Sequence, residues 1–244
     1  MRFDVITLFP EMFSALNYGI NGRAIKKGLV DLNIWNLRDF TDDRYQMTDD
    51  RPYGGGPGML MMAEPLVKTI DFVKSEAPKS KTVFLNPGGA LFTQKKAKKY
   101  KNEDGIIFIS GRYEGIDERV IEKYIDEEIS VGDYILSGGE LPAMTVIDSI
   151  IRLIPNVLNN ADSIREESFE EGLLDYPSYT RPESILGKAI PEVLKSGDHG
   201  KINNWRSKQA LIRTWLKRPD LLERKKLTEK ERSIIEDFLT NGKS

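Results

Sequence analysis

The sequence predicts an α/β protein with a parallel sheet, followed by a small all-α C-terminal region. Three observations predict it. Short apolar, β-branched runs alternate with helical patterns, as they do in βαβ units. Three of these runs end in glycine-containing turns, at residues 86–89, 111–115 and 132–139. From residue 191 onward the chain shows helical patterns, interrupted at residues 218–220.

The N-terminal elements predict one βαβ unit. Residues 2–9 form an apolar strand that ends at Pro10, and residues 29–35 alternate apolar and polar side chains as a second strand. Between them, Pro10 begins a helical stretch, and a short helix over residues 20–27 ends at Gly28. Because parallel neighbours need a crossover of this kind, the two strands are expected to pair.

A long polar loop over residues 39–59 follows. It ends in Arg51-Pro52-Tyr53-Gly54-Gly55-Gly56-Pro57-Gly58-Met59. Loops longer than about 12 residues are uncommon unless they act as lids or binding loops. This loop therefore suits a segment that wraps a ligand, and a flexible turn is the alternative. It is not a phosphate-cradling P-loop, because the Gly-Lys-Ser/Thr ending is missing.

The middle of the chain carries the predicted ligand site. In open α/β sheets ligands bind outside the carboxyl ends of the strands, so the three glycine turns are expected to converge on one ligand. None of the turns is a Gly-x-Gly-x-x-Gly fingerprint, so an ordinary dinucleotide site is not supported. The predicted strands are 82–85, 106–110 and 128–131, and the predicted helices are 64–73, 93–100, 116–124 and 141–154.

The stretch Ser130 to Pro142 is the one around which the other motifs are arranged. Gly132, Gly138 and Gly139 permit unusual backbone and let a ligand approach the main chain closely. Such a loop suits a flat, neutral group, such as an adenine edge, held through backbone N–H and C=O groups. A plain strand-to-helix connection is the alternative.

Composition excludes several classes of protein. The chain has 244 residues, enough for one large domain or for one large and one small. No apolar run approaches the roughly 20 residues of a membrane span, and residues 1–10 indicate a strand rather than a signal peptide. The absence of cysteine and the single histidine, His199, exclude thiolate and multi-histidine metal sites. They leave carboxylates, Tyr or Lys as proton acceptors. We expect a cytoplasmic protein.

Charge is distributed unevenly along the chain. Residues 195–244 hold 13 Lys and Arg against 7 Asp and Glu, a net charge of +6, whereas residues 111–183 hold 6 against 17, a net charge of −11. The basic segment includes a helix that Asp198 is expected to cap, and a last helix over residues 228–239. A surface for an acidic partner and an ordinary solvated helix surface both explain this asymmetry. Residues 156–179 are polar and acidic, typical of a linker that is partly disordered without ligand.

Four motifs occur together and in order. They are Pro52-Tyr53-Gly54-Gly55-Gly56-Pro57-Gly58-Met59, Gly111-Arg112-Tyr113-Glu114-Gly115-Ile116-Asp117-Glu118-Arg119, Val131-Gly132-Asp133-Tyr134-Ile135-Leu136-Ser137-Gly138-Gly139-Glu140 and Tyr179-Thr180-Arg181-Pro182. In these motifs, and over nearly its whole length, the chain resembles the bacterial tRNA (guanine-N1)-methyltransferases of the SPOUT superfamily.

The resemblance implies a deep trefoil knot in the parallel-sheet domain, an exception among protein folds. It implies S-adenosylmethionine as methyl donor, tRNA as substrate, and N1 of the guanosine immediately 3′ of the anticodon as target. It also implies a homodimer with shared active sites. The expected organisation is a knotted methyltransferase domain over residues 1–158, a flexible linker over 159–178 and a helical tRNA-binding domain over 179–244. Two alternatives remain: a SPOUT-type methyltransferase of ribosomal RNA or a ribose 2′-OH, and a non-catalytic RNA-binding protein.

Site residues follow from the same resemblance. The family's catalytic Asp, just before Ser-Phe, falls on Glu167, which is one methylene longer, and its arginine falls on Arg152. Glu167 is expected to take the N1 proton while Arg152 stabilises charge on guanine O6. The residues expected to bind cofactor are Pro87, Gly111, Val131, Gly132, Asp133, Tyr134, Ile135, Leu136, Gly139 and Pro142.

The RNA contacts are predicted in two places. Tyr113, with the loop over residues 39–59, and Glu114 are expected to line the pocket for the target base. The basic C-terminal helices are expected to follow tRNA phosphates through Lys201, Arg206, Lys208 and Arg213. Glu114 and Asp133 are the carboxylates available to recruit Mg²⁺. Nothing in the sequence requires a metal ion, however, so no metal site is predicted.

Overall fold

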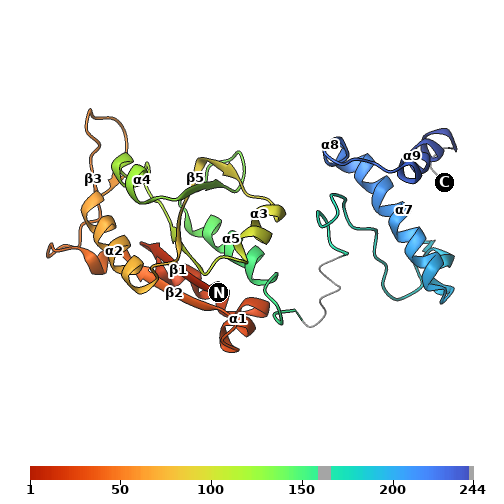
Figure 1. The fold of residues 1–244 in the computed structure, drawn as a ribbon, viewed down its shortest axis with the longest axis horizontal. Coiled ribbons are helices and arrows are strands. Elements are labelled where there is room, and N and C mark those ends of the chain that lie inside the picture. Colours follow the sequence, from red (N-terminus) through yellow and green to blue (C-terminus); the bar gives the residue numbers. More distant parts are fainter. Residues whose placement is uncertain (159–165, 242–244) are drawn as a thin grey trace. The chain divides into compact units, whose positions relative to one another are not determined.

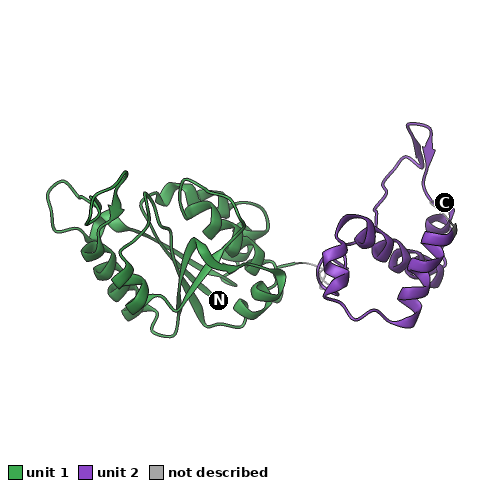
Figure 2. Cartoon of the chain, turned by 90° about the horizontal axis from the view of Figure 1, so that it is seen from above, with its two compact units in different colours: residues 1–159 green, residues 160–244 purple. Residues whose placement is uncertain are grey.

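The structure is a computed structural model, and it describes residues 1–158 and 166–241. The chain divides into two units, residues 1–159 and 160–244, which are described separately below (Figure 2). In the part of the chain that the structure describes, no helix is long and apolar enough to cross a membrane.

A parallel sheet of five strands, in the order β2-β1-β6-β5-β7, organises the first unit (Figure 1). Every residue of the central strand β6 is buried, as expected for a parallel strand covered on both faces. The predicted βαβ unit is confirmed, because β1 pairs with β2 from Arg2 opposite Asp31 to Thr7 opposite Asn36. The strands are β1 (Arg2–Thr7), β2 (Asp31–Asn36), β5 (Lys81–Leu91), β6 (Gly105–Ile109) and β7 (Glu127–Ser130).

Helices cover the sheet. Ile107 and Ile109 of the sheet share one buried cluster with Leu66 and Ile70 of α2 and with Val120 of α4. Helix α5 contacts β1 and also both α1 and α3. Figure 1 shows α2 and α4 on one side of the sheet and α3 and α5 on the other. The helices are α1 (Gly19–Lys26), α2 (Ala63–Glu76), α3 (Gln94–Tyr100), α4 (Glu118–Tyr124) and α5 (Glu140–Ile151), with 3-10 segments at η1 (Pro10–Asn17) and η2 (Leu37–Phe40).

The structure differs from the prediction in two segments of this unit. Strand β5 does not end at Leu85 but continues to Leu91, with a break in its register between Leu85 and Ala90. The glycine turn at 86–89 is therefore an irregularity within a strand. The polar loop is also not wholly irregular, because β3 (Asp49–Asp50) and β4 (Leu60–Met61) form an antiparallel pair. Strands of two residues have no alternation that sequence patterns detect.

The second unit contains α7 (His199–Lys217), α8 (Pro219–Glu223), α9 (Glu229–Asn241) and the 3-10 segment η3 (Glu192–Lys195). The predicted cap is confirmed, because the Asp198 side chain accepts a hydrogen bond from the backbone N–H of Lys201. The prediction of helices alone missed the antiparallel pair β8 (Ser184–Ile185) and β9 (Lys188–Ala189).

The predicted linker is described from residue 166 onward, and residues 159–165 lie outside the described residues. Leu173 packs against a buried cluster of Leu211, Leu222 and Ile235 from the three helices of the second unit. The backbone N–H of Leu174 donates to Thr214 Oγ1 at 2.8 Å. Residues from the predicted linker thus contribute to the core of the helical unit.

Candidate functional site

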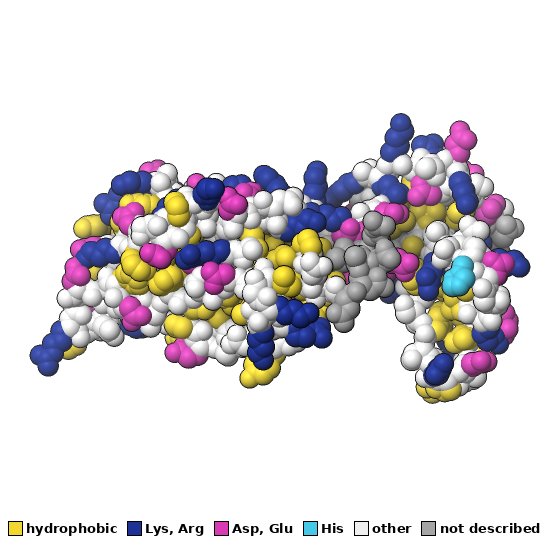
Figure 3. Space-filling model, turned by 60° about the horizontal axis from the view of Figure 1, so that its bottom comes forward, with side chains coloured by type: hydrophobic (Ala, Val, Ile, Leu, Met, Phe, Trp, Pro, Cys, Tyr) yellow, Lys and Arg dark blue, Asp and Glu magenta, His cyan; other side chains and the backbone are white. Residues whose placement is uncertain are grey.

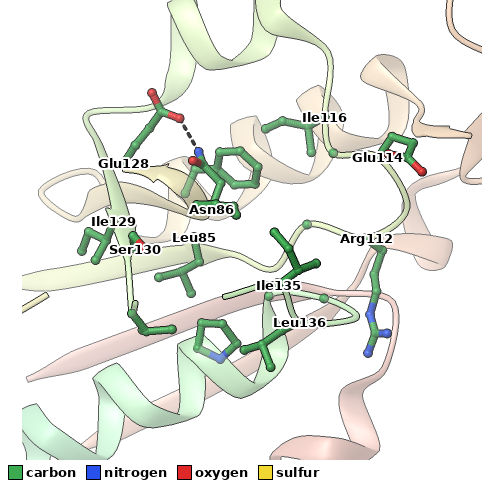
Figure 4. A pocket seen from close by; sticks show the side chains of 18 of the residues that line it. Leu85, Asn86, Arg112, Glu114, Ile116, Glu128, Ile129, Ser130, Ile135 and Leu136 are labelled. Carbon is green, nitrogen blue, oxygen red and sulfur yellow. Dashed lines mark hydrogen bonds between the residues drawn. The ribbon is translucent and has the colours of Figure 1, made fainter. Parts of the chain in front are cut away.

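The carboxyl-terminal ends of β6 and β7, together with the middle of β5, surround a cleft of about 510 Å³ (Figure 4). Apolar side chains from three segments form part of its wall, among them Leu85, Ile129 and Ile135. The expected convergence is therefore confirmed for the ends of β6 and β7, whereas the third segment, residues 84–87, lies within β5 rather than at its end. The lining residues fall mainly in 84–87, 111–116, 128–132 and 134–139.

The backbone of two of these segments meets at Gly139. Its N–H donates to the carbonyl oxygen of Gly111 at 2.8 Å. A Cβ atom at residue 139 would lie 2.7 Å from Ser110 Cα and 2.8 Å from Gly111 N, distances that real Cβ atoms do not show. Only glycine allows this close approach, so the two segments meet at one side of the cleft.

Arg112 connects the same two segments through its side chain. Its Nε lies 2.8 Å from Glu140 Oε2, and its Nη1 donates to the carbonyl oxygen of Ser137 at 3.0 Å. Its guanidinium carbon lies 4.4 Å from the centre of the Phe9 ring. Glu140 is fully buried and also accepts a hydrogen bond from Thr7 Oγ1 at 2.9 Å. Neither Arg112 nor Glu140 was predicted as a site residue from the sequence, where the available signal was an acid directly after a pair of glycines.

The charged side chains of the cleft are mainly acidic. Glu114, Glu118 and Glu128 all line it, whereas the charge of Arg112 is offset by Glu140. Asn86 donates to Glu128, an interaction that Figure 4 marks, and its Oδ1 accepts from the backbone N–H of Gly88. A cleft with apolar walls, exposed main chain and several carboxylates suits a ligand with a flat ring and positive charge.

The loop over residues 39–59 is joined to this cleft through the turn after β6. The backbone N–H of Glu114 donates to the carbonyl oxygen of Met59 at 2.9 Å. Tyr113 has a φ of 59°, in the left-handed region that non-glycine residues rarely adopt. Partial burial raises the pKa of Tyr113, and a hydrogen bond to Asp49 raises it further. The phenol therefore stays protonated at neutral pH and lies on the cleft wall.

Most of the predicted cofactor residues share this cleft. Nine of the ten line it, and Asp133 does not. Tyr113 and Glu114, which we expected to contact the target base, line the same cleft. The cofactor and RNA roles themselves stay predictions.

The other predicted residues lie in separate places. Arg152 is the C-cap of α5 in the first unit, and Glu167 lies in the second. Their meeting at one active site therefore stays a prediction. Among residues 1–158 and 166–241, no cluster of three or more His, Cys, Asp or Glu is arranged to hold a metal ion.

The predicted tRNA contacts Lys201, Arg206, Lys208 and Arg213 all lie on α7. Three of them have acidic neighbours. Lys201 Nζ is 3.3 Å from Asp198 Oδ2, Arg206 Nη1 is 3.6 Å from Glu166 Oε2, and Arg213 Nη1 is 3.8 Å from Asp175 Oδ1. Figure 3 shows both signs of charge interspersed on the visible face of the helical unit.

A parallel α/β sheet with a cleft of exposed main chain at its strand ends is typical of enzymes that bind a nucleotide-like cofactor. Residues 1–224 of the chain match the family model described as tRNA (Guanine-1)-methyltransferase TrmD. The chain belongs to this family.

Curated relatives agree over nearly the full length. A tRNA (guanine-N(1)-)-methyltransferase from Methylococcus capsulatus is 52% identical over 98% of this chain and 96% of its own. Proteins of the same name from Photorhabdus laumondii and Escherichia coli are 54% and 53% identical, again over 98% of this chain and over 96% and 95% of their own.

Proposed function

We propose that this protein transfers a methyl group from S-adenosylmethionine to N1 of the guanosine immediately 3′ of the anticodon in tRNA. One observation carries the proposal. The chain is 52–54% identical, over 98% of its length, to relatives named as tRNA (guanine-N(1)-)-methyltransferases. The cleft at the strand ends is the place where this chemistry occurs.

The cleft has the properties that S-adenosylmethionine requires. Partly exposed main chain at Gly111, Gly132 and Gly138 suits the edge of the adenine ring, and Leu85, Ile129 and Ile135 suit its faces. Carboxylates on the wall favour a ligand with a sulfonium and an ammonium group. When bound, the cofactor supplies an activated methyl group. We propose Pro87, Gly111, Val131, Gly132, Tyr134, Ile135, Leu136, Gly139 and Pro142 as its contacts, with Asp133 as a tenth from the resemblance.

Guanine N1 carries a proton at neutral pH, so methyl transfer to it needs a base. We propose that Glu167 takes this proton and that Arg152 stabilises the negative charge that develops on guanine O6. The absence of cysteine and the single histidine favour a carboxylate in this role. Positioning of the base opposite the methyl group then lowers the barrier further.

The target base must leave the anticodon loop to reach the cleft, at a cost of a few kcal/mol. We propose that Tyr113 and Glu114 contact the everted guanine, since both line the cleft.

We propose α7 as the helix that follows the tRNA phosphates. Mg²⁺ is not part of the proposed mechanism.

The wider organisation is also proposed. We infer a deep trefoil knot, an exception to the rule that chains do not thread. Supporting it, the chain leaves β7 at one edge of the sheet and returns past β5 and β6, so that Glu140 begins α5 beside Thr7 of β1. We propose a cytoplasmic homodimer with shared active sites, with a methyltransferase domain over residues 1–158, a linker over 159–178 and a tRNA-binding domain over 179–244. Leu173 and Leu174 of the proposed linker pack on the helical unit, so the linker is anchored there at its C-terminal part.

The test is transfer of labelled methyl from S-adenosylmethionine to a tRNA transcript, paired with a transcript whose guanosine 3′ of the anticodon is replaced by adenosine. Label in the first transcript and none in the second supports the proposal. Label in both keeps the cofactor and the tRNA substrate but overturns the target, which is then another base or a ribose 2′-OH. Label in neither, with cofactor binding intact, overturns the tRNA substrate.

A further inference from the structure

The buried hydroxyl of Thr214 is an unusual feature of α7. Thr214 has no exposed surface and lies three residues after Leu211, on the face of the helix that packs into the core. Its Oγ1 donates to the carbonyl oxygen of Ala210 at 2.7 Å and accepts the backbone N–H of Leu174 at 2.8 Å. The second hydrogen bond joins the helix to a segment 40 residues earlier in the chain.

That segment is a folded loop. The backbone N–H of Phe169 donates to the carbonyl oxygen of Leu173 at 2.7 Å, which closes the loop. Ser168 Oγ donates to Asp175 Oδ1 and accepts the backbone N–H of Asp175, at 3.1 and 3.0 Å. Gly172, with a φ of 77°, makes the reversal, and the partly buried Leu173 packs against the helices. Residues 168–175, called the acid loop below, are therefore fixed at one end by Leu174 and Thr214.

Glu167 directly precedes the acid loop, and its carbonyl oxygen accepts the backbone N–H of Glu170 at 3.3 Å. We propose that Thr214 is a positioning residue for methyl transfer: by holding the acid loop on α7, it makes Glu167 part of the helical unit. The base then reaches the guanine together with the helix that holds the tRNA. This inference rests on the proposed role of Glu167.

Thr214→Val tests the inference, because valine keeps the branched shape and removes both hydrogen bonds. With saturating tRNA and S-adenosylmethionine we expect kcat to fall about 10- to 100-fold, the usual effect of a misplaced catalytic group. The Kd for tRNA is expected to stay within about twofold, and Thr214→Ser, which keeps the hydroxyl, is expected to restore kcat. Thr240→Val is the matched control, because exposed Thr240 also donates to a carbonyl one turn earlier, that of Glu236.

A double variant separates positioning from general loss of structure. If Thr214 acts through Glu167, Thr214→Val lowers kcat in the wild-type background but causes no further loss in Glu167→Ala. An equal loss in both backgrounds overturns the inference, and so does a Thr214→Val enzyme as active as Thr240→Val. Near-normal activity of Glu167→Ala instead overturns the proposed base, which is a separate result.

Amide hydrogen exchange adds a test whose first part, the protection of Leu174 in the wild-type protein, needs no variant. The amide of Leu174 is expected to be protected in the wild-type protein, both free and with tRNA bound, and to exchange at least tenfold faster in Thr214→Val. Rapid exchange of Leu174 in the wild-type protein overturns the inference, because the acid loop then opens freely.

Discussion

Arg112 Nε lies 2.8 Å from Glu140 Oε2, and this contact joins the turn after β6 to the first residue of α5. Glu140 has no exposed surface, and Arg112 is largely covered. The two atoms do not form an aligned hydrogen bond, so their attraction is that of an ion pair. A buried carboxylate needs such a partner, because its charge is otherwise uncompensated.

We therefore predict that Arg112→Met destabilises the protein by about 3 kcal/mol or more, the usual effect of breaking a buried ion pair. Urea denaturation of the two proteins measures this difference. Arg119→Met is the control, because Arg119 pairs with Asp117 while its own side chain is 76% exposed, and an exposed pair contributes about 1 kcal/mol or less. Equal, small losses in both variants would show that the Arg112 contact does not stabilise the fold.

Gly139→Ala is predicted to weaken cofactor binding at least tenfold. The added methyl would lie 2.7 Å from Ser110 Cα, so the chain must move by several tenths of an ångström at the cleft wall. Overpacking of this kind also costs about 1–3 kcal/mol of stability. Calorimetric titration with S-adenosylmethionine measures the affinity. Gly200→Ala on α7, where an added Cβ would lie 3.3 Å from the Asp198 side-chain oxygen, should bind the cofactor normally. An unchanged affinity in Gly139→Ala would show that the close approach at residue 139 does not shape the cofactor site.

Strand β7, which leads into the cleft, is predicted to lose stability in acid. Burial alone raises the pKa of Glu127, but hydrogen bonds from Lys96 and Tyr100 outweigh it, and the pKa is lowered. The folded state therefore binds this proton less readily than the unfolded state, whose pKa is about 4.3. The stabilisation is complete above that value and is lost as the pH falls through the folded pKa.

Glu127→Gln isolates this contribution. Between about pH 5 and pH 3 the free energy of unfolding of the wild-type protein should fall more steeply than that of the variant. Other carboxylates titrate in both proteins, so the difference between the two curves is the measured quantity. Parallel curves would mean that Glu127 does not contribute.

Much of the cleft was predictable, because the apolar runs that form β5, β6 and β7 are continuous and each ends in a turn of distinct composition. The extension of β5 to Leu91 was not predictable. Pro87, Gly88 and Gly89 break the strand pattern in the sequence, yet the chain still pairs with β7 beyond them. Such pairing depends on a neighbour far along the chain. The Arg112–Glu140 contact was missed for the same reason.

The acidic segment before Tyr179 shows a different limit of sequence reasoning. Its charge predicts a linker without a core of its own. Leu173 and Leu174 nevertheless bind to α7, because the helices supply an apolar surface and a buried hydroxyl that the segment itself does not contain. Local composition carries no information about a surface that another element provides.

Binding of tRNA is predicted to weaken steeply with salt. If the cations of α7 contact phosphates, Lys208→Ala should weaken binding at low salt and reduce the slope of log K against log salt concentration by about one. Fluorescence anisotropy between about 50 and 200 mM salt measures it. Lys79→Ala is the control, since Lys79 is exposed before β5, at the end of the sheet opposite the cleft. A slope that Lys208→Ala leaves unchanged would exclude this phosphate contact.

Glu167→Ala is predicted to lower kcat by about 10² to 10⁴, the usual contribution of a general base, while the affinities for tRNA and S-adenosylmethionine stay nearly unchanged. Single-turnover methylation with saturating substrates measures the chemical step directly. Glu171→Ala is the matched control, because it removes a nearby exposed carboxylate. The substitution keeps the hydrogen bond that holds this residue, which Lys225 Nζ donates to the backbone carbonyl oxygen of Glu171. If both variants methylate normally, the proton acceptor is another group. If both variants lose activity equally, the total negative charge of this segment is important rather than one proton-accepting side chain. A loss confined to Glu167→Ala, relieved by raising the pH toward the pKa of guanine N1, would identify the missing step as removal of that proton.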